Sequence, residues 1–143
     1  VVPLTTGATV GIAQFKRRAG RVVVAAEFIG DIGMLICRGD TILLPDDLAA
    51  GDRYTSHPST INAEPKPNVT VRRMDPQDLK RGDVVLLYSD GLGGWLVDRV
   101  VGSTVLDHLK SIDGPTFVKL VRTEQRAKRM VVDDVTMVRV EVL

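Results

Sequence analysis

The most informative stretch of the chain is Gly82-Asp83-Val84-Val85-Leu86-Leu87-Tyr88-Ser89-Asp90-Gly91-Leu92. Its middle part, from 83 to 88, is almost continuously apolar, whereas a strand with one solvated face alternates apolar and polar residues. We therefore predict a strand that is buried on both faces. An aspartate directly after such a strand is held rigidly and can reach a cleft, and the glycine beside Asp90 allows close approach of the backbone. The stretch predicts a central strand that ends at a candidate functional carboxylate.

The composition of the 143 residues fits one soluble globular domain, and 44% apolar against 26% charged residues argues against a disordered chain. Lys plus Arg number 19 and Asp plus Glu 18, a balance that argues against a nucleic-acid-coating protein. No apolar run approaches the ~20 residues that a membrane span needs. The single cysteine, Cys37, excludes an internal disulfide framework and a cysteine-based zinc site. We expect an intracellular protein, cytoplasmic or mitochondrial, with no nucleic-acid or membrane partner.

The sequence on the N-terminal side of this stretch predicts antiparallel strands. Two β-branched runs enclose a polar turn at Lys16–Gly20, a pattern that is typical of a hairpin. Residues 75–79 read as a turn or a short helical turn. The alternation stops between Pro45 and Asn68, and a segment of this length exceeds an ordinary connection, so we expect a long loop over 45–68. The strands are expected at 8–15, 21–28, 34–37, 41–44 and 69–74.

The sequence after the central stretch predicts two helices and a closing strand. Ser103 can cap a first helix whose apolar residues recur on one face. Asp113-Gly114-Pro115 begins a second helix, since proline suits the first turn, and its basic end at 126–129 is expected to be solvated. Residues 135–143 alternate as a final strand. The order predicts an α+β fold, with an antiparallel sheet packed under helices. The residues expected to face inward are Val105, Leu106, Leu109, Ile112, Phe117, Val118, Leu120 and Val121.

Three aspartate sites lie next to apolar runs that are expected to be buried strands: Asp31, Asp90 and the pair Asp133-Asp134. Taken singly, each fits a turn or a helix cap. Several carboxylates cannot lie close together without a cation, because like charges raise each other's pKa. Hard oxygen ligands of this kind suit Mg²⁺ or Mn²⁺. Both a metal site and three separate turn aspartates are compatible with the spacing.

Several short motifs resemble the metal-dependent PPM (PP2C-type) protein phosphatases. The stretch 82–92 is similar to that family's "GD-apolar-SDGL" motif. Asp133-Asp134-Val135-Thr136 resembles the closing "D-[ND]-x-T" strand, in the form with two aspartates found in the SpoIIE-like and PTC7-like branches. Earlier in the chain, Thr6-Gly7-Ala8-Thr9 and Ile29–Gly33 resemble the "GsTa" and "GDS" motifs, and Arg38-Gly39-Asp40 the "R-x-G" turn. The motifs occur in the family's order and cover nearly the whole chain.

The resemblance implies an αββα sandwich that holds two Mg²⁺ or Mn²⁺ ions. These ions activate a bridging water, which attacks a phosphoserine or phosphothreonine of a phosphoprotein substrate. By position, Asp90 binds one metal and Asp133 binds another or bridges through water. Asp31 matches the aspartate of a more weakly held third metal, and Gly91 lets the backbone pass close to the metal. Asp134 is a weaker candidate ligand.

The chain departs from the family pattern at two places. The family's N-terminal Glu-Asp pair and "DGxGG" segment are absent, so we expect this chain to be the C-terminal part of the domain. A missing N-terminal segment would then complete the fold and cover an exposed sheet edge near Thr5–Phe15. Many members also carry an aspartate where this chain has Gly94, which puts the third metal in doubt. His57, in the 45–68 loop, is a weak candidate for the general acid.

A second hypothesis is a catalytically silent PPM-like module that serves binding or regulation. Residues upstream of Val1 would discriminate the two, because an upstream "DGxGG" and Glu-Asp pair would favour the enzyme. The sequence also contains Arg-Gly-Asp twice, at 38–40 and 81–83. An adhesive ligand is one interpretation of this tripeptide, but both copies precede strands, where glycine and aspartate are expected as turn residues.

Overall fold

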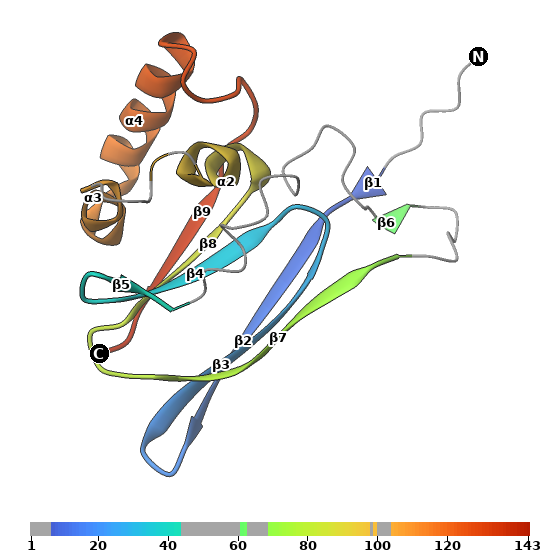
Figure 1. The fold of residues 1–143 in the computed structure, drawn as a ribbon, viewed down its shortest axis with the longest axis vertical. Coiled ribbons are helices and arrows are strands. Elements are labelled where there is room, and N and C mark those ends of the chain that lie inside the picture. Colours follow the sequence, from blue (N-terminus) through green and yellow to red (C-terminus); the bar gives the residue numbers. More distant parts are fainter. Residues whose placement is uncertain (1–6, 44–60, 63–68, 98, 100–103) are drawn as a thin grey trace.

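The computed structural model describes residues 7–43, 61–62, 69–97, 99 and 104–143, which form two main antiparallel sheets and a layer of helices (Figure 1). The predicted α+β class is confirmed. Strands β1 (Gly7–Ala8) and β6 (Ile61–Asn62) add a separate two-stranded pairing. Strand β6 is the only part of the expected 45–68 loop that lies inside the described residues. Within the described residues, no helix is long and apolar enough to cross a membrane.

The first sheet has the strand order β2-β3-β7, formed by β2 (Val10–Arg18), β3 (Arg21–Ile29) and β7 (Val71–Leu79). The hairpin predicted around Lys16–Gly20 is confirmed, but its strands run up to a two-residue turn. Both turn residues, Ala19 and Gly20, have positive φ, the conformation that matches the twist of the flanking strands. Strand β2 is one edge of this sheet, as expected for the described part of Thr5–Phe15. Ile12 is 62% and Phe15 36% exposed there.

The turn or short helical turn predicted at 75–79 is wrong, because β7 continues to Leu79. Its register against β3 shifts between Val24 and Ala26, which marks a bulge. Proline lacks the N–H that a ladder needs, and bulges are among the few places where a strand accepts it. Pro76 therefore interrupts the pairing locally without ending the strand.

The second sheet has the order β5-β4-β8-β9, formed by β4 (Gly33–Arg38), β5 (Thr41–Ile42), β8 (Val84–Tyr88) and β9 (Met137–Glu141). The predicted central strand is β8, which pairs with β4 on one side and β9 on the other. Gly33 pairs with Tyr88, and a Cβ at Gly33 would lie 2.6 Å from Cζ of that ring. The absence of a side chain at Gly33 therefore makes room for a buried tyrosine.

The two sheets pack face to face around one apolar cluster. Strand β3 contributes Val24 and Phe28 from the first sheet, and alternate residues of β4 and β8 contribute from the second. The remaining residues of β4 and β8 point to the opposite face of the second sheet, which explains why their sequences do not alternate. The buried members of this sheet–sheet cluster are Val24, Ala26, Phe28, Met34, Ile36, Leu79 and Val85.

Helices α2 (Asp90–Val97), α3 (Val105–Ser111) and α4 (Gly114–Arg126) cover the other face of the second sheet (Figure 1). The predicted helices correspond to α3 and α4, and Asp113 caps α4 by accepting a hydrogen bond from the backbone N–H of Thr116 at 2.7 Å. Ser103, the predicted cap of α3, lies outside the described residues. The buried members of this sheet–helix cluster are Leu35, Cys37, Val84, Leu86, Tyr88, Leu92, Trp95, Leu96, Leu109, Ile112 and Met130.

Three details of the helical layer differ from the sequence expectations. Helix α2 was not predicted as a helix, because its glycines hide the periodicity. Val118 was expected to face inward, but it is 46% exposed. The basic end of α4 was expected to be only solvated, but Arg129 forms an ion pair with the buried Glu124 at 2.7 Å. Arg129 is held at this position by the buried carboxylate of Glu124, which lies in the last turn of α4.

The two Arg-Gly-Asp copies are joined by an ion pair. Arg38, at the end of β4, donates to both carboxylate oxygens of Asp83, at 3.0 and 2.7 Å. Asp83 is 1% exposed and also accepts a hydrogen bond from the backbone N–H of Lys80. The second copy therefore buries its aspartate, which supports a structural role in place of an adhesive one.

Candidate functional site

Asp31 lies in the turn after β3, and Arg72 fixes the backbone of this turn. Gly30 adopts a φ of 93°, a conformation that glycine accepts without strain. The Nη2 group of Arg72 donates hydrogen bonds to the carbonyl oxygens of Gly30 at 3.0 Å and Ile32 at 2.5 Å. The same guanidinium lies 5.3 Å from the centroid of the Phe28 ring. The two residues that flank Asp31 are thus held by one side chain from β7.

Arg72 is a residue that the sequence analysis missed. It pairs with Phe28 across the sheet, and Phe28 faces the sheet–sheet cluster. The feature of the sequence that could have identified Arg72 is a basic residue at an inward-facing position of a strand, where apolar residues are usual. Recognising it requires the register of β7 against β3, which the sequence alone did not supply.

The carboxylate of Asp31 is buried and incompletely satisfied. Asp31 is 3% exposed, and its Oδ2 atom is the one buried side-chain oxygen or nitrogen in the described part of the chain that has no hydrogen-bond partner. The pKa of Asp31 is raised mainly by burial and, to a smaller extent, by the neighbouring carboxylate of Asp90. An uncompensated buried carboxylate is costly, so this position favours a bound cation or proton.

Asp90 follows β8 and begins α2, where the positive end of the helix dipole favours a negative charge. Its Oδ1 atom accepts a hydrogen bond from the backbone N–H of Gly91 at 2.8 Å. The structure therefore brings together two of the predicted site residues, Asp31 from the first sheet and Asp90 from the second. They are 59 positions apart in the sequence, and the packing of the sheets makes them neighbours.

The segment before β9 lies directly against the end of β8. The backbone N–H of Ser89 donates to the carbonyl of Thr136 at 3.1 Å, and the N–H of Thr136 donates to the Ser89 hydroxyl at 3.0 Å. A Cβ at Gly91 would lie 3.1 Å from Cγ2 of Val135 and 3.5 Å from the carbonyl oxygen of Asp134. The two strongest motifs of the sequence are thus side by side, with Gly91 at their closest approach.

Asp133 and Asp134 are exposed within this segment. Oδ1 of Asp133 accepts a hydrogen bond from the backbone N–H of Asp134 at 2.7 Å, and Gln125 donates to the Asp133 carbonyl at 2.9 Å. In the described part of the chain, no three His, Cys, Asp or Glu side chains form a group that could hold a metal ion. Asp133 and Asp134 are therefore close to the Asp31–Asp90 pair in the fold without joining it as a third carboxylate.

The Asp31–Asp90 pair fits part of a site for a hard divalent cation. Two adjacent carboxylates, one with an unpartnered buried oxygen, offer the oxygen ligands that Mg²⁺ and Mn²⁺ prefer. Mg²⁺ usually takes one or two carboxylates and keeps several waters, so a pair suffices for a partial site. His57 lies outside the described residues, and Gly94 lies within α2, where it supplies no ligand.

The fold is similar to that of two solved PP2C-type phosphatases. One is the phosphatase domain of the cell fate determinant SpoIIE from Bacillus subtilis, with a TM-score of 0.56 and 18% identity over 94% of this chain. A Mn-presoaked structure of that domain gives a TM-score of 0.52 and 17% identity over 92% of this chain. The other is PppA, a key regulatory component of T6SS in Pseudomonas aeruginosa, with a TM-score of 0.57 and 17% identity over 96% of this chain.

These similarities show the fold. The chain spans 58% of the length of the SpoIIE domain and of PppA, and 56% of the Mn-presoaked structure. No protein-family model and no curated protein sequence matches the chain. The PP2C-like fold that the sequence motifs implied is confirmed at the level of architecture.

Proposed function

We propose that this chain, which has the fold of PP2C-type phosphatases, contributes the carboxylates of a metal centre that hydrolyses phosphoserine or phosphothreonine in proteins. The observation that carries the proposal is the buried, unpartnered oxygen of Asp31 beside Asp90. The similarity to two phosphatases supports the reaction class. Charge is the physical reason, because the buried carboxylate of Asp31 and the half-buried carboxylate of Asp90 repel each other unless a cation lies between them.

In this proposal, Asp90 and Asp31 would hold Mg²⁺ or Mn²⁺, and Asp133 would act on a second ion. Bound ions of this kind supply an activated water and neutralise the charge of the phosphate. The other residues keep the carboxylates in position. Arg72 holds the turn of Asp31 through two carbonyls, and the paired backbone of Ser89 and Thr136 joins the Asp90 and Asp133 segments.

The test is Mn²⁺-dependent hydrolysis of p-nitrophenyl phosphate and of a phosphoserine peptide by the full-length protein. We expect Asp90→Asn to reduce the activity to background, because the amide removes the charge that holds the ion. Asp75→Asn is the matched control, since it makes the same change of charge at an exposed position of β7 that belongs to neither motif. This control should keep the wild-type rate.

Calorimetric titration with Mn²⁺ separates a lost ion from a lost fold. Asp90→Asn should weaken Mn²⁺ binding while circular dichroism shows an intact protein. Activity that survives Asp90→Asn would show that the metal assignment is wrong. A wild-type protein that neither binds Mn²⁺ nor hydrolyses either substrate would contradict the enzyme and favour the silent module.

A further inference from the structure

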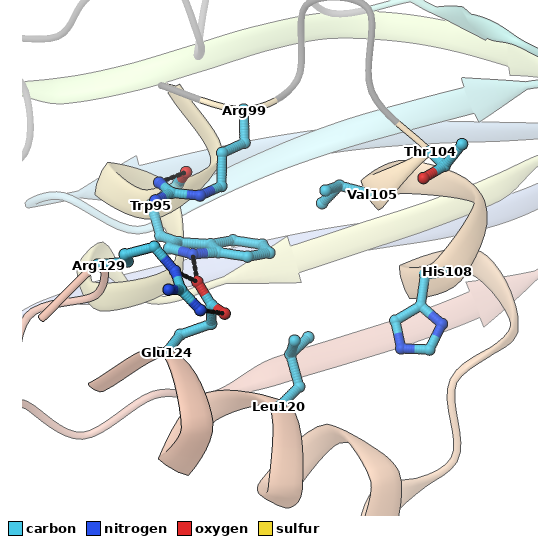
Figure 2. A pocket seen from close by; sticks show the side chains of 8 residues that line it. All are labelled: Trp95, Arg99, Thr104, Val105, His108, Leu120, Glu124 and Arg129. Carbon is cyan, nitrogen blue, oxygen red and sulfur yellow. Dashed lines mark hydrogen bonds and ion pairs between the residues drawn. The ribbon is translucent and has the colours of Figure 1, made fainter. Parts of the chain in front are cut away.

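A hollow of about 380 Å³ lies between α2, α3 and α4, separate from the Asp31–Asp90 pair (Figure 2). Its size is within the range of ligand pockets, about 300–1,000 Å³. Figure 2 shows Trp95 and Glu124 on one side, Val105 and His108 on the other, and Leu120 between them. The walls formed by Trp95, Val105 and Leu120 are apolar. The hollow can therefore receive an apolar group of a partner.

The charge of Glu124 in this hollow is already compensated. Oε2 of Glu124 accepts hydrogen bonds from the Trp95 indole N–H at 3.0 Å and from Nε of Arg129 at 2.9 Å. Oε1 accepts a hydrogen bond from Nη2 of Arg129 at 2.7 Å. These hydrogen bonds lower the pKa of Glu124 to about 2, and those from Arg129 have the largest effect. Glu124 and Arg129 thus form a neutral, rigid pair that also orients the Trp95 ring.

Arg99 is the second cation that lines this hollow, and among the described residues it forms no ion pair as close as that of Arg129 with Glu124. Its guanidinium lies 5.2 Å from the centroid of the Trp95 ring, and Nη1 donates to the Trp95 carbonyl at 3.3 Å. A guanidinium has five N–H donors, so Arg99 keeps donors for an anion. His108 lines the facing wall, and among the described residues its imidazole has no hydrogen-bond or ion-pair partner. Both groups can approach a carboxylate at the mouth of the hollow.

Helix α4 and the turn after it, which supply Leu120, Glu124 and Arg129 to the hollow, are rich in exposed basic residues. Between 114 and 132 the sequence contains one acid, Glu124, which is paired with Arg129. Such a one-sided charge attracts acidic partners and raises their rate of association. Apart from Arg129, which is paired with Glu124, the cations of this segment are Lys119, Arg122, Arg126 and Lys128.

We propose that this hollow is a docking pocket for an acidic segment of a partner protein. The segment inserts one apolar side chain between Val105 and Leu120 and places a neighbouring carboxylate on Arg99. The occupant is a peptide and not single-stranded nucleic acid, because stacking of bases needs an open aromatic face. Trp95 is 5% exposed, and Arg99 covers its ring.

The test uses a fluorescein-labelled heptapeptide with one phenylalanine between three acidic residues on each side. Fluorescence anisotropy with the full-length protein should show saturable binding. Replacing the phenylalanine by alanine should weaken binding by about tenfold, the effect of losing a buried anchor worth about 1.4 kcal/mol. The readout is binding, so it succeeds or fails independently of phosphatase activity.

Two variants and one matched control locate the site. Arg99→Glu should weaken binding by about tenfold or more, because it puts an anion where the carboxylate docks. His108 is exposed on the facing wall of the pocket. If Arg99→Glu does not fold, His108→Glu serves as the second variant and should also weaken binding of the peptide. Arg126→Glu makes the same change of net charge on the exposed surface of α4, outside the pocket, and should weaken binding by less than about threefold, since salt screens distant charges.

Three results would overturn the proposal. One is the absence of saturable binding up to ~1 mM peptide, a dissociation constant too weak for a specific site. Another is equal weakening by Arg99→Glu and Arg126→Glu, which would mean nonspecific attraction to the basic surface. The third is tighter binding of a labelled seven-nucleotide thymidine oligonucleotide than of the peptide, with loss in Arg99→Glu. That result would assign the pocket to nucleic acid.

Discussion

The carboxylate of Asp31 is buried against Asp90, and its Oδ2 atom has no hydrogen-bond partner among the described residues. Ionised carboxylates lose free energy of hydration when they are buried, and only a partner restores it. In protein treated with EDTA, Asp31→Asn should therefore raise the free energy of unfolding by about 1–3 kcal/mol. The amide is uncharged and can donate a hydrogen bond to Asp90. Urea unfolding of both proteins in EDTA measures the difference, with Asp75→Asn as an unchanged control.

The same position predicts a pH dependence. Because the pKa of Asp31 is raised in the folded protein, protonation of Asp31 stabilises the fold. This stabilisation is fully present at low pH and is lost as the pH rises through the pKa of the folded protein. The stability gained by Asp31→Asn should therefore shrink as pH falls toward and below 3.8, the ordinary pKa of the group. An advantage of the variant that stays constant down to pH 3 would contradict a buried charge as its cause.

At the scale of elements, one ion pair joins the end of β4 to the chain that enters β8. Asp83 is 1% exposed and accepts hydrogen bonds from Arg38 and from the backbone N–H of Lys80. Asp83→Ala should lower the free energy of unfolding by about 3 kcal/mol, because buried donors lose their acceptor. Denaturant unfolding at pH 7 measures the loss. The hydrogen bonds from Arg38 are the main cause that lowers the pKa of Asp83. The contribution of ionised Asp83 to the free energy of unfolding is therefore present above pH 3.8 and is lost in more acidic solution.

The matched control for this prediction is Asp78→Ala. Asp78 also pairs with an arginine, Arg21, but at 3.8 Å and with both side chains mostly exposed. Exposed pairs of this kind contribute less than about 1 kcal/mol. Equal losses in Asp83→Ala and Asp78→Ala would show that burial is not what makes the first pair strong.

At the scale of the whole molecule, the sequence predicted the elements whose pattern is local. The apolar run of β8, the hairpin of β2 and β3, and the capped start of α4 each depend on neighbouring residues, and all three are confirmed. Helix α2 was missed because its glycines carry no apolar pattern. Strand β7 was cut short because Pro76 reads as a breaker, and only the pairing partner reveals a bulge.

The candidate site followed the same division. The motifs placed Asp31 and Asp90 next to buried strands, and the structure makes these two neighbours. Asp133 and Asp134 were predicted as ligands, and their roles stay predictions. Two interactions between residues far apart in the sequence could not be predicted: the hydrogen bond of Arg72 to the turn of Asp31 and that of the Trp95 indole N–H to Glu124. Sequence spacing does not indicate either pairing, since Arg72 lies 42 and 40 positions from Gly30 and Ile32, and Glu124 lies 29 positions from Trp95.

The two cores of the molecule share β4, whose adjacent residues Met34 and Leu35 point to opposite sides. Met34 belongs to the sheet–sheet cluster and Leu35 to the sheet–helix cluster, and both are fully buried. Loss of β4 would open both layers, so we predict that the described fold unfolds in one transition. Met34→Ala and Leu35→Ala should each lower the free energy of unfolding by about 2–5 kcal/mol.

Two probes in the same urea series check this prediction. The fluorescence of Trp95, the single tryptophan of the chain, reports on the sheet–helix core, and hydrogen exchange of the β3 amides reports on the sheet–sheet core. In each variant, both probes should shift to the same lower urea midpoint, because a strand that serves two cores couples them. If Leu35→Ala moved the tryptophan transition and left the β3 amides protected, the helical layer would be a separate cooperative unit, and sharing of β4 would not be enough to join the layers.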